Sequence, residues 1–131
     1  MKVVLDTNVL LSAFAAHGLC EAVFQVCLSK HEIVLSRHIL KEVTRNLRAK
    51  LKVSARDTDA IVTLLRKNAT LVKPAHIAPG LCDDQDDLPV LGTVLAAKAD
   101  CFVTGDQHLL ELKEFHAIPI LSPRAFHDRL M

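Results

Sequence analysis

The stretch KVVLDTN at residues 2–8 decides the fold. Its first half is a short run of apolar, mostly β-branched residues, which favours a buried strand. The run ends abruptly at Asp6, and an apolar helical pattern covers residues 9–16. A buried strand that passes directly into a helix is typical of a parallel sheet covered by helices.

The alternation of strand and helix continues along the chain. Further strands are expected at residues 32–35, 70–72, 101–104 and 118–121. Helices are expected at residues 19–28, 37–51, 57–67 and 87–98, with a short helix after Asp106 and a terminal helix from Pro123. This pattern predicts an α/β fold of three layers, α/β/α, in which a mostly parallel five-stranded sheet lies between two layers of helices.

Length and composition exclude several classes of protein. The chain has 131 residues, which fits a single domain over residues 1–131, and half of them are apolar, which excludes a disordered tail. No apolar run reaches the roughly 18 residues of a membrane helix, and no secretory signal is apparent at the start, so we expect a cytoplasmic protein away from membranes. Four cysteines without a CxxC pair are expected to be small buried residues in a reducing compartment.

Five acidic residues fall near the ends of the predicted strands. Asp6 follows the first strand and Asp106 follows the fourth, while Asp84 and Asp87 stand where the central helix begins. Glu42 lies at the edge of the apolar stripe of its helix, from where it can lean toward the sheet. Because sites in open α/β sheets form beyond the carboxyl ends of the strands, where the strand order reverses, we expect these carboxylates to converge there.

Each acid has a simpler explanation when it is taken alone. The four aspartates stand at helix starts, where aspartate caps free N–H groups, and Glu42 alone reads as a surface charge. Together, however, converging carboxylates repel one another unless a cation offsets the repulsion. Hard divalent ions take oxygen ligands, and two such ions can activate a water and steady the leaving oxygen of a phosphodiester.

The motifs that carry these acids resemble those of the PIN-domain nucleases, and among them the prokaryotic VapC-like toxins of toxin–antitoxin pairs. VVLDTNVLLSAF at residues 3–14 is similar to the first motif of the family and SRHILKEV at residues 36–43 to the second. DDQDDLPVLGTVLAAKADCFVTGDQHLL at residues 83–110 resembles the third and fourth motifs, although Gln85 stands where many relatives have proline and Leu88-Pro89 where polar residues are usual. The resemblance covers nearly the whole chain.

The resemblance implies a role for each matching residue. The catalytic acids would be Asp6, Glu42, Asp87 and Asp106, which also hold Mg²⁺ or Mn²⁺ together with the auxiliary acid Asp84, and the supporting residues would be Asn8 and Thr104. The resemblance further implies the strand order 3-2-1-4-5, a metal-dependent endoribonuclease activity, a homodimer and a cognate antitoxin as protein partner.

A stripe of basic residues accompanies the acids. Arg37, Lys41, Arg45 and Arg48 share one face of a helix, where they can hold RNA phosphates beside an acidic pocket. A solvated helix face explains the stripe equally well. The formal net charge of +1 does not by itself indicate any class of partner. The absence of tyrosine and tryptophan limits stacking on RNA bases, which favours recognition of the RNA backbone.

We therefore expect a divalent-metal-dependent endoribonuclease that hydrolyses RNA phosphodiesters, and two other classes remain as alternatives. The first is a catalytically silent PIN-like module that binds RNA or a protein partner. The second is a Mg²⁺-dependent phosphatase or receiver-like domain, which should have paired acids after its first strand and a lysine after a late strand. Here Thr7-Asn8 follow the first acid and Ser122-Pro123 follow the last strand, so this class ranks low.

Overall fold

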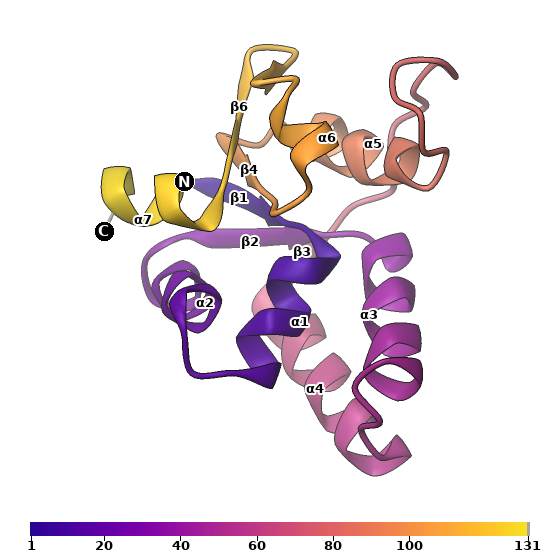
Figure 1. Cartoon of the computed structure of the whole chain (residues 1–131), viewed down its shortest axis with the longest axis vertical. Helices are drawn as coiled ribbons and strands as arrows, with labels where there is room; N and C mark the ends of the chain where they lie inside the picture. Colours follow the sequence, from indigo (N-terminus) through magenta and orange to yellow (C-terminus); the bar gives the residue numbers. More distant parts are fainter. Residues whose placement is uncertain (131) are drawn as a thin grey trace.

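A computed structural model, which describes residues 1–130, has a six-stranded sheet with helices on both faces (Figure 1). The strands are β1 (Lys2–Leu5), β2 (Glu32–Leu35), β3 (Ala69–Leu71), β4 (Cys101–Val103), β5 (Glu114–Phe115) and β6 (Ile118–Leu121). The helices are α1 (Thr7–Ala15), α2 (Leu19–Lys30), α3 (Arg37–Ala49), α4 (Ala55–Asn68), α5 (Asp87–Ala97), α6 (Gln107–Leu110) and α7 (Pro123–Leu130). The expected α/β class is confirmed.

The strand order is β3-β2-β1-β4-β6-β5. The five expected strands are all parallel and follow the order that the resemblance implied. The expected count of five was too low, because β5 pairs antiparallel with β6. This hairpin has only two residues in β5, and its turn uses His116 and Ala117 at φ values of 50° and 64°. Such turns normally contain Asn-Gly or another glycine pair, so the sequence carries no hairpin signal here.

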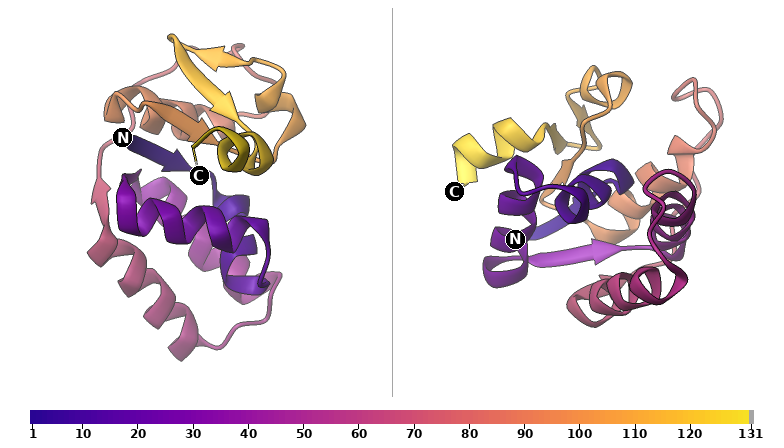
Figure 2. Two further views of the ribbon diagram at one scale, coloured as in Figure 1. Left: turned by 90° about the vertical axis from the view of Figure 1, so that its left-hand side faces the viewer. Right: turned by 60° about the horizontal axis from the view of Figure 1, so that its bottom comes forward.

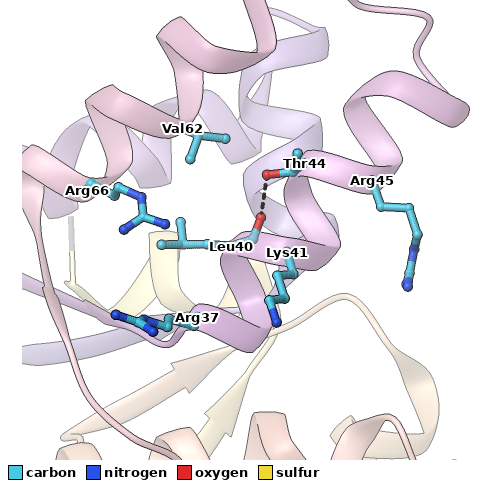
Figure 3. Close-up of a pocket in the computed structure, with 7 residues that line it drawn as sticks. All are labelled: Arg37, Leu40, Lys41, Thr44, Arg45, Val62 and Arg66. Atoms are coloured by element: carbon cyan, nitrogen blue, oxygen red, sulfur yellow. Dashed lines mark hydrogen bonds between the residues drawn. The ribbon is translucent and has the colours of Figure 1, made fainter. Parts of the chain in front are cut away.

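The strand order reverses between β1 and β4. Figures 1 and 2 show α1 to α4 on one side of the sheet and α5 on the other, as right-handed crossovers require when the chain moves first to one edge and then to the opposite edge. Helices α3 and α4 pack side by side, and residues of both line a shallow hollow (Figure 3). Thr93 of α5 donates a hydrogen bond of 2.8 Å to Ser36, the N-cap of α3, so the two helix layers are tied at the carboxyl edge of the sheet.

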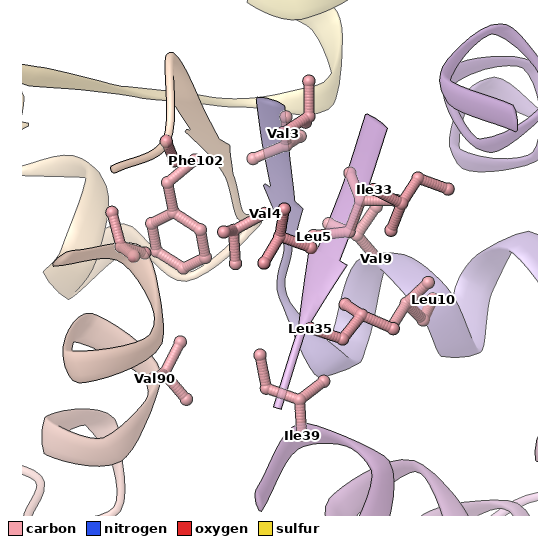
Figure 4. Packing of buried hydrophobic residues seen from close by; sticks show 14 of the residues in the cluster. Val3, Val4, Leu5, Val9, Leu10, Ile33, Leu35, Ile39, Val90 and Phe102 are labelled. Atoms are coloured by element: carbon pink, nitrogen blue, oxygen red, sulfur yellow. The ribbon is translucent and has the colours of Figure 1, made fainter. Parts of the chain in front are cut away.

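The core lies on both faces of β1, whose last three residues are fully buried. In Figure 4, Val90 of α5 lies on the side of Phe102, and Leu10 of α1 lies on the side of Ile33 and Leu35. Burial of a strand on both faces explains its continuous apolar run. It also places Asp6, the residue that follows the strand, at the end of an element that is buried on both faces.

Helix α5 makes a close backbone contact with the segment that leads to the acidic loop. The Ala75 N–H donates a hydrogen bond of 2.9 Å to the carbonyl of Gly92, which is buried in α5. A Cβ atom at residue 92 would lie 2.2 Å from the Ala75 carbonyl oxygen. Only glycine therefore allows this approach, and the contact holds the start of the loop against the helix that carries Asp87.

The expectation of four buried cysteines is confirmed only in part. All four cysteines are free, and Cys27 and Cys101 are buried, whereas Cys20 and Cys82 are half-buried because they lie nearer the surface. Within residues 1–130 no single helix is both long and apolar enough to cross a membrane; α1 and α2 pass such a test only as a pair, and they are bent by 106° with respect to each other.

Candidate active site

Asp6 and Asp106 are linked through the hydroxyl of Thr104 at the carboxyl ends of β1 and β4. Thr104 Oγ1 donates a hydrogen bond of 2.6 Å to Asp6 Oδ2 and accepts one of 3.1 Å from the backbone N–H of Asp106. Thr104 is fully buried, and Asp6 is 8% exposed. The residue that the sequence marked as a support is thus in direct contact with the first acid and fixes its position relative to the second.

Both of these aspartates also cap helices, as their positions suggested. Asp6 Oδ1 accepts a hydrogen bond of 2.8 Å from the N–H of Thr7 at the start of α1. Asp106 Oδ1 accepts one of 2.8 Å from the N–H of His108 at the start of α6. Capping accounts for one oxygen of each carboxylate, and the other oxygen of Asp106 accepts no hydrogen bond from residues 1–130. Capping and ligand binding are therefore compatible at this edge.

Glu42 lies against α1, where solvent reaches only 17% of its side chain. Thr7 Oγ1 donates a hydrogen bond of 2.9 Å to Glu42 Oε1, and the Nε2 atom of His38 lies 3.4 Å from the same oxygen. This position excludes the simpler explanation of a surface charge. Neither Thr7 nor His38 was expected at the site from the sequence; the signal for Thr7 was its place directly after the first acid.

Asp87 and Asp106 border a hollow of about 620 Å³. The other lining residues come from the acidic loop and α6, and they are Cys82, Asp83, Asp84, Gln85, Asp86 and His108. Helix α5 begins without a side-chain cap, so capping does not explain Asp87. Asp84 is exposed, and its Oδ1 accepts a hydrogen bond of 2.9 Å from the N–H of Asp86, so one of its oxygens stabilises the loop itself.

Two of the predicted residues, Asn8 and Arg48, do not lie where the sequence suggested. Asn8 is exposed, and its side chain forms no hydrogen bond within residues 1–130, while its neighbour Thr7 makes the contact to the acids. In the basic stripe, Arg37, Lys41 and Arg45 line the hollow between α3 and α4, and Arg48 does not.

The acids are coupled electrostatically. Partial burial, followed by the charges of Asp106, Asp84, Asp6 and Glu42, raises the pKa of Asp87 from 3.8 to about 6. Burial also raises the pKa of Asp6, and the charges of Glu42 and Asp106 add to the rise, while hydrogen bonds from Thr104 and Thr7 oppose it. No lysine or arginine within residues 1–130 forms an ion pair with any of these acids. No permanently cationic side chain within residues 1–130 therefore offsets their mutual repulsion.

This repulsion predicts a pH-dependent stability. A carboxylate whose pKa rises on folding stabilises the fold below its unfolded pKa, and the stabilisation is lost as the pH rises through the folded value. For Asp87 the window runs from pH 3.8 to about 6. Because the side chain is partly solvated, we expect the loss to be about 1 kcal/mol.

Asp87→Asn should accordingly melt about 3–5 °C above the wild type at pH 7 without metal, and the two proteins should converge near pH 4. Thermal melts across this pH range test the expectation, with Asp59→Asn as a control because Asp59 is an exposed acid on α4. Identical pH profiles for wild type and Asp87→Asn would show that the carboxylates are not coupled.

The donor set fits a hard divalent cation held partly by water. Within residues 1–130 no three histidine, cysteine, aspartate or glutamate side chains converge closely enough to enclose one ion. Mg²⁺ does not need such a cage, because it uses one or two carboxylates and retains water or substrate oxygens for the remaining positions. Uncompensated carboxylates that include a half-buried Asp87 meet this requirement, and a cation there would offset their repulsion.

Comparisons with known proteins agree with this fold. A family model described as PIN domain matches residues 2–108, and the chain belongs to the PIN domain family. PIN domains are generally nucleases, which places the chain among the hydrolases. No curated protein matches the sequence.

Among solved structures, the chain is similar to one of VapBC2 from Rickettsia felis bound to a DNA fragment from the promoter of the pair. The TM-score is 0.66, with 16% sequence identity over 93% of this chain and 98% of the other. At this identity the match establishes a shared fold.

Proposed function

We propose that the chain is a divalent-metal-dependent endoribonuclease and the toxin of a toxin–antitoxin pair. One observation carries the proposal: carboxylates from four separate parts of the chain are coupled electrostatically where the strand order reverses, and no lysine or arginine within residues 1–130 forms an ion pair with them. Such an arrangement weakens the fold, so it is best explained by a ligand that the acids bind. The membership of the PIN domain family supports a nuclease.

Each side chain has a defined part in this proposal. Bound Mg²⁺ or Mn²⁺ would stabilise charge on the phosphate and make water more acidic. Asp6, Asp87 and Asp106 would hold the cation, with Asp84 as an auxiliary ligand from the loop. Glu42, held by Thr7, would orient the attacking water. Thr104 keeps Asp6 in the orientation that ligation needs.

The proposed reaction is hydrolysis. The water oxygen attacks phosphorus and gives up a proton, and the bond from phosphorus to the 3′ oxygen breaks. The 3′ oxygen leaves as a hydroxyl after it takes a proton, and the phosphate remains on the 5′ side of the following nucleotide. This product polarity is what the family resemblance implies.

The test is cleavage of structured and unstructured RNA by the purified protein with Mn²⁺ and with EDTA. The proposal predicts cleavage with Mn²⁺ only, and products that a 5′-phosphate-dependent exonuclease then degrades. If no RNA is cut and Mn²⁺ does not raise the melting temperature, the nuclease proposal is wrong, and the chain is instead a silent module that binds RNA or protein.

The proposed partners are a cognate antitoxin and a second copy of the chain. The fold is shared with a chain in the structure of VapBC2 from Rickettsia felis, which is bound to a DNA fragment from their promoter. A small neighbouring gene for a DNA-binding protein, and the copurification of its product with this chain, would support the antitoxin. Light scattering of the purified chain tests the homodimer.

The contact between Thr7 and Glu42 gives a separate prediction. Thr7→Val keeps the shape of a buried side chain but removes the hydroxyl that holds Glu42 Oε1. We expect kcat to fall about tenfold with little change in KM, because the loss of one neutral-to-charged hydrogen bond corresponds to about 1.5 kcal/mol. Steady-state kinetics on one RNA substrate make the measurement.

Thr58→Val is the matched control for Thr7→Val. Thr58 is also buried, and its hydroxyl has no hydrogen-bond partner within residues 1–130, so its removal should leave cleavage unchanged and stability unchanged or slightly improved. An unchanged kcat in Thr7→Val, or an equal fall in both variants, would show that Thr7 does not position Glu42.

A further inference from the structure

A basic hollow of about 410 Å³ lies between α3 and α4, and Glu42, which Thr7 contacts, is not among the residues of α3 that line it. It is lined by Arg37, Leu40, Lys41, Thr44, Arg45, Val62 and Arg66, and is called the α3–α4 groove below (Figure 3). Four of these seven residues are cationic and none is acidic. Its volume falls within the range of about 300–1,000 Å³ that is typical of small-ligand sites.

The cations of the groove have no acidic partners. Within residues 1–130 none of the four forms an ion pair. In Figure 3, Arg37 and Arg66 approach Leu40 from two sides, Lys41 lies near Arg37, and Arg45 extends away from them. Like charges held around one hollow repel one another, so the groove favours an anionic occupant.

The floor of the groove is apolar, which favours an anion that also carries an apolar or aromatic part over a simple inorganic anion. Leu40 and Val62 lie between the cationic side chains, and the hydroxyl of Thr44 already donates to the Leu40 carbonyl at 2.8 Å. A free phosphate needs only the cations. A nucleotide uses both features, because its phosphate pairs with arginine and its base or sugar covers apolar surface.

A second hollow shares Arg37 with the groove. Arg37, in the first turn of α3, also lines a second hollow of about 470 Å³, together with Lys73 and residues 71–74 around it. Glu42 follows Lys41 directly in α3, so the two side chains point about 100° apart from one helix. One polymer strand can therefore cross α3 from the groove to the acids, which a compact anion cannot do.

We propose that the α3–α4 groove binds an unpaired nucleotide of the RNA substrate at a distance from the cleaved phosphodiester, with Arg66 and Arg37 on its phosphate. The inference rests on the proposed ribonuclease activity. Bases in a duplex face their partners and cannot reach the floor at Leu40 and Val62, so the groove selects single strands or loops. In this proposal α4 also takes part in substrate binding, through Arg66. The basic stripe on α3 alone does not predict this role.

Arg66→Ala and Lys67→Ala form a matched pair for the test. Both residues are exposed cations in the last turn of α4, and only Arg66 lines the groove. Binding of fluorescein-labelled oligo(U), and of an RNA duplex of the same length, is measured by anisotropy in EDTA over a range of salt concentrations. The salt series counts the phosphate contacts that each variant loses.

Arg66→Ala should weaken oligo(U) binding about tenfold and lower its salt slope by about 0.7, while duplex binding stays unchanged and Lys67→Ala matches the wild type. Equal losses in both variants, or equal losses for oligo(U) and duplex, would overturn the proposal. A loss of affinity for an acidic peptide without a loss for oligo(U) would also overturn it, and would assign the groove to a protein partner.

Cleavage assays separate this inference from the proposed function. In Mn²⁺, Arg66→Ala should raise KM for a long unstructured RNA about tenfold and leave cleavage of the dinucleotide UpU unchanged, because a dinucleotide cannot span the acids and the groove. Unchanged KM for the long RNA would reject the groove and leave the nuclease standing. If the wild type cuts no RNA, and Arg66→Ala still loses binding to oligo(U) but not to the duplex, the groove proposal is supported and the nuclease proposal is rejected.

Discussion

Asp6→Asn is expected to abolish RNA cleavage, with a loss of at least about a thousandfold, while the fold is retained. The substitution removes the charge of the most buried carboxylate of the edge, whose pKa burial has already raised. The amide oxygen can still accept the hydrogen bond from the Thr7 N–H that caps α1. Since the variant also relieves the repulsion with Glu42 and Asp106, its melting temperature without metal should equal or exceed that of the wild type.

Single-turnover cleavage of one RNA and a thermal melt, made on the same preparations of Asp6→Asn, check both halves of this expectation. Asp100→Asn is the control, because Asp100 is an exposed acid at the opposite end of β4. Cleavage that survives in Asp6→Asn would point to a contaminating nuclease, and a melting temperature far below that of the wild type would contradict the repulsion at the edge.

Gly92→Ala is expected to cost about 3 kcal/mol of the free energy of unfolding, or about 10 °C in the melting temperature. Alanine usually stabilises a helix by about 1 kcal/mol relative to glycine. Here its Cβ would lie 2.2 Å from the Ala75 carbonyl oxygen and 3.2 Å from the Ala75 nitrogen. Both are backbone atoms, so the segment before the acidic loop must move and its hydrogen bond to Gly92 must break.

Urea unfolding of Gly92→Ala measures this loss, and Gly18→Ala provides the comparison because a Cβ at residue 18 would meet no atom within 4 Å. Gly18→Ala should change the free energy of unfolding by less than about 1 kcal/mol. A Gly92→Ala protein as stable as the wild type would mean that α5 and the loop segment do not pack as described.

The strands and the helix starts were readable from the sequence because they depend on local pattern. The buried run before Asp6 could only be a strand covered on both faces, and the helix expected from residue 37 begins there, with Ser36 as its N-cap. The first helix nevertheless starts at Thr7 rather than at residue 9, because Asp6 itself provides the cap. The strand order came from the family resemblance, since local pattern does not specify which strands pair.

The candidate site was predictable where it depends on strand ends and not where it depends on packing between helices. Glu42 lies at the edge of the apolar stripe of its helix, and this position in the helical period predicted that its side chain leans toward the sheet. The hydroxyl of Thr7 reaches Glu42 across 35 residues of sequence, and Arg66 joins the basic residues only because α4 packs beside α3. Arg48 shares the face of Arg45 by periodicity, but it lies in the last turn of α3, past the residues that line the groove.

Binding of Mn²⁺ to wild type and to Asp6→Asn, measured by calorimetry at pH 7, tests the central claim most directly. The claim is that the acids at the β1–β4 edge form a cation site rather than a set of helix caps. It predicts saturable binding to the wild type, weakened at least tenfold in Asp6→Asn, together with a rise in the wild-type melting temperature on addition of the ion. Absence of binding to the wild type, or equal affinity in both proteins, would contradict it.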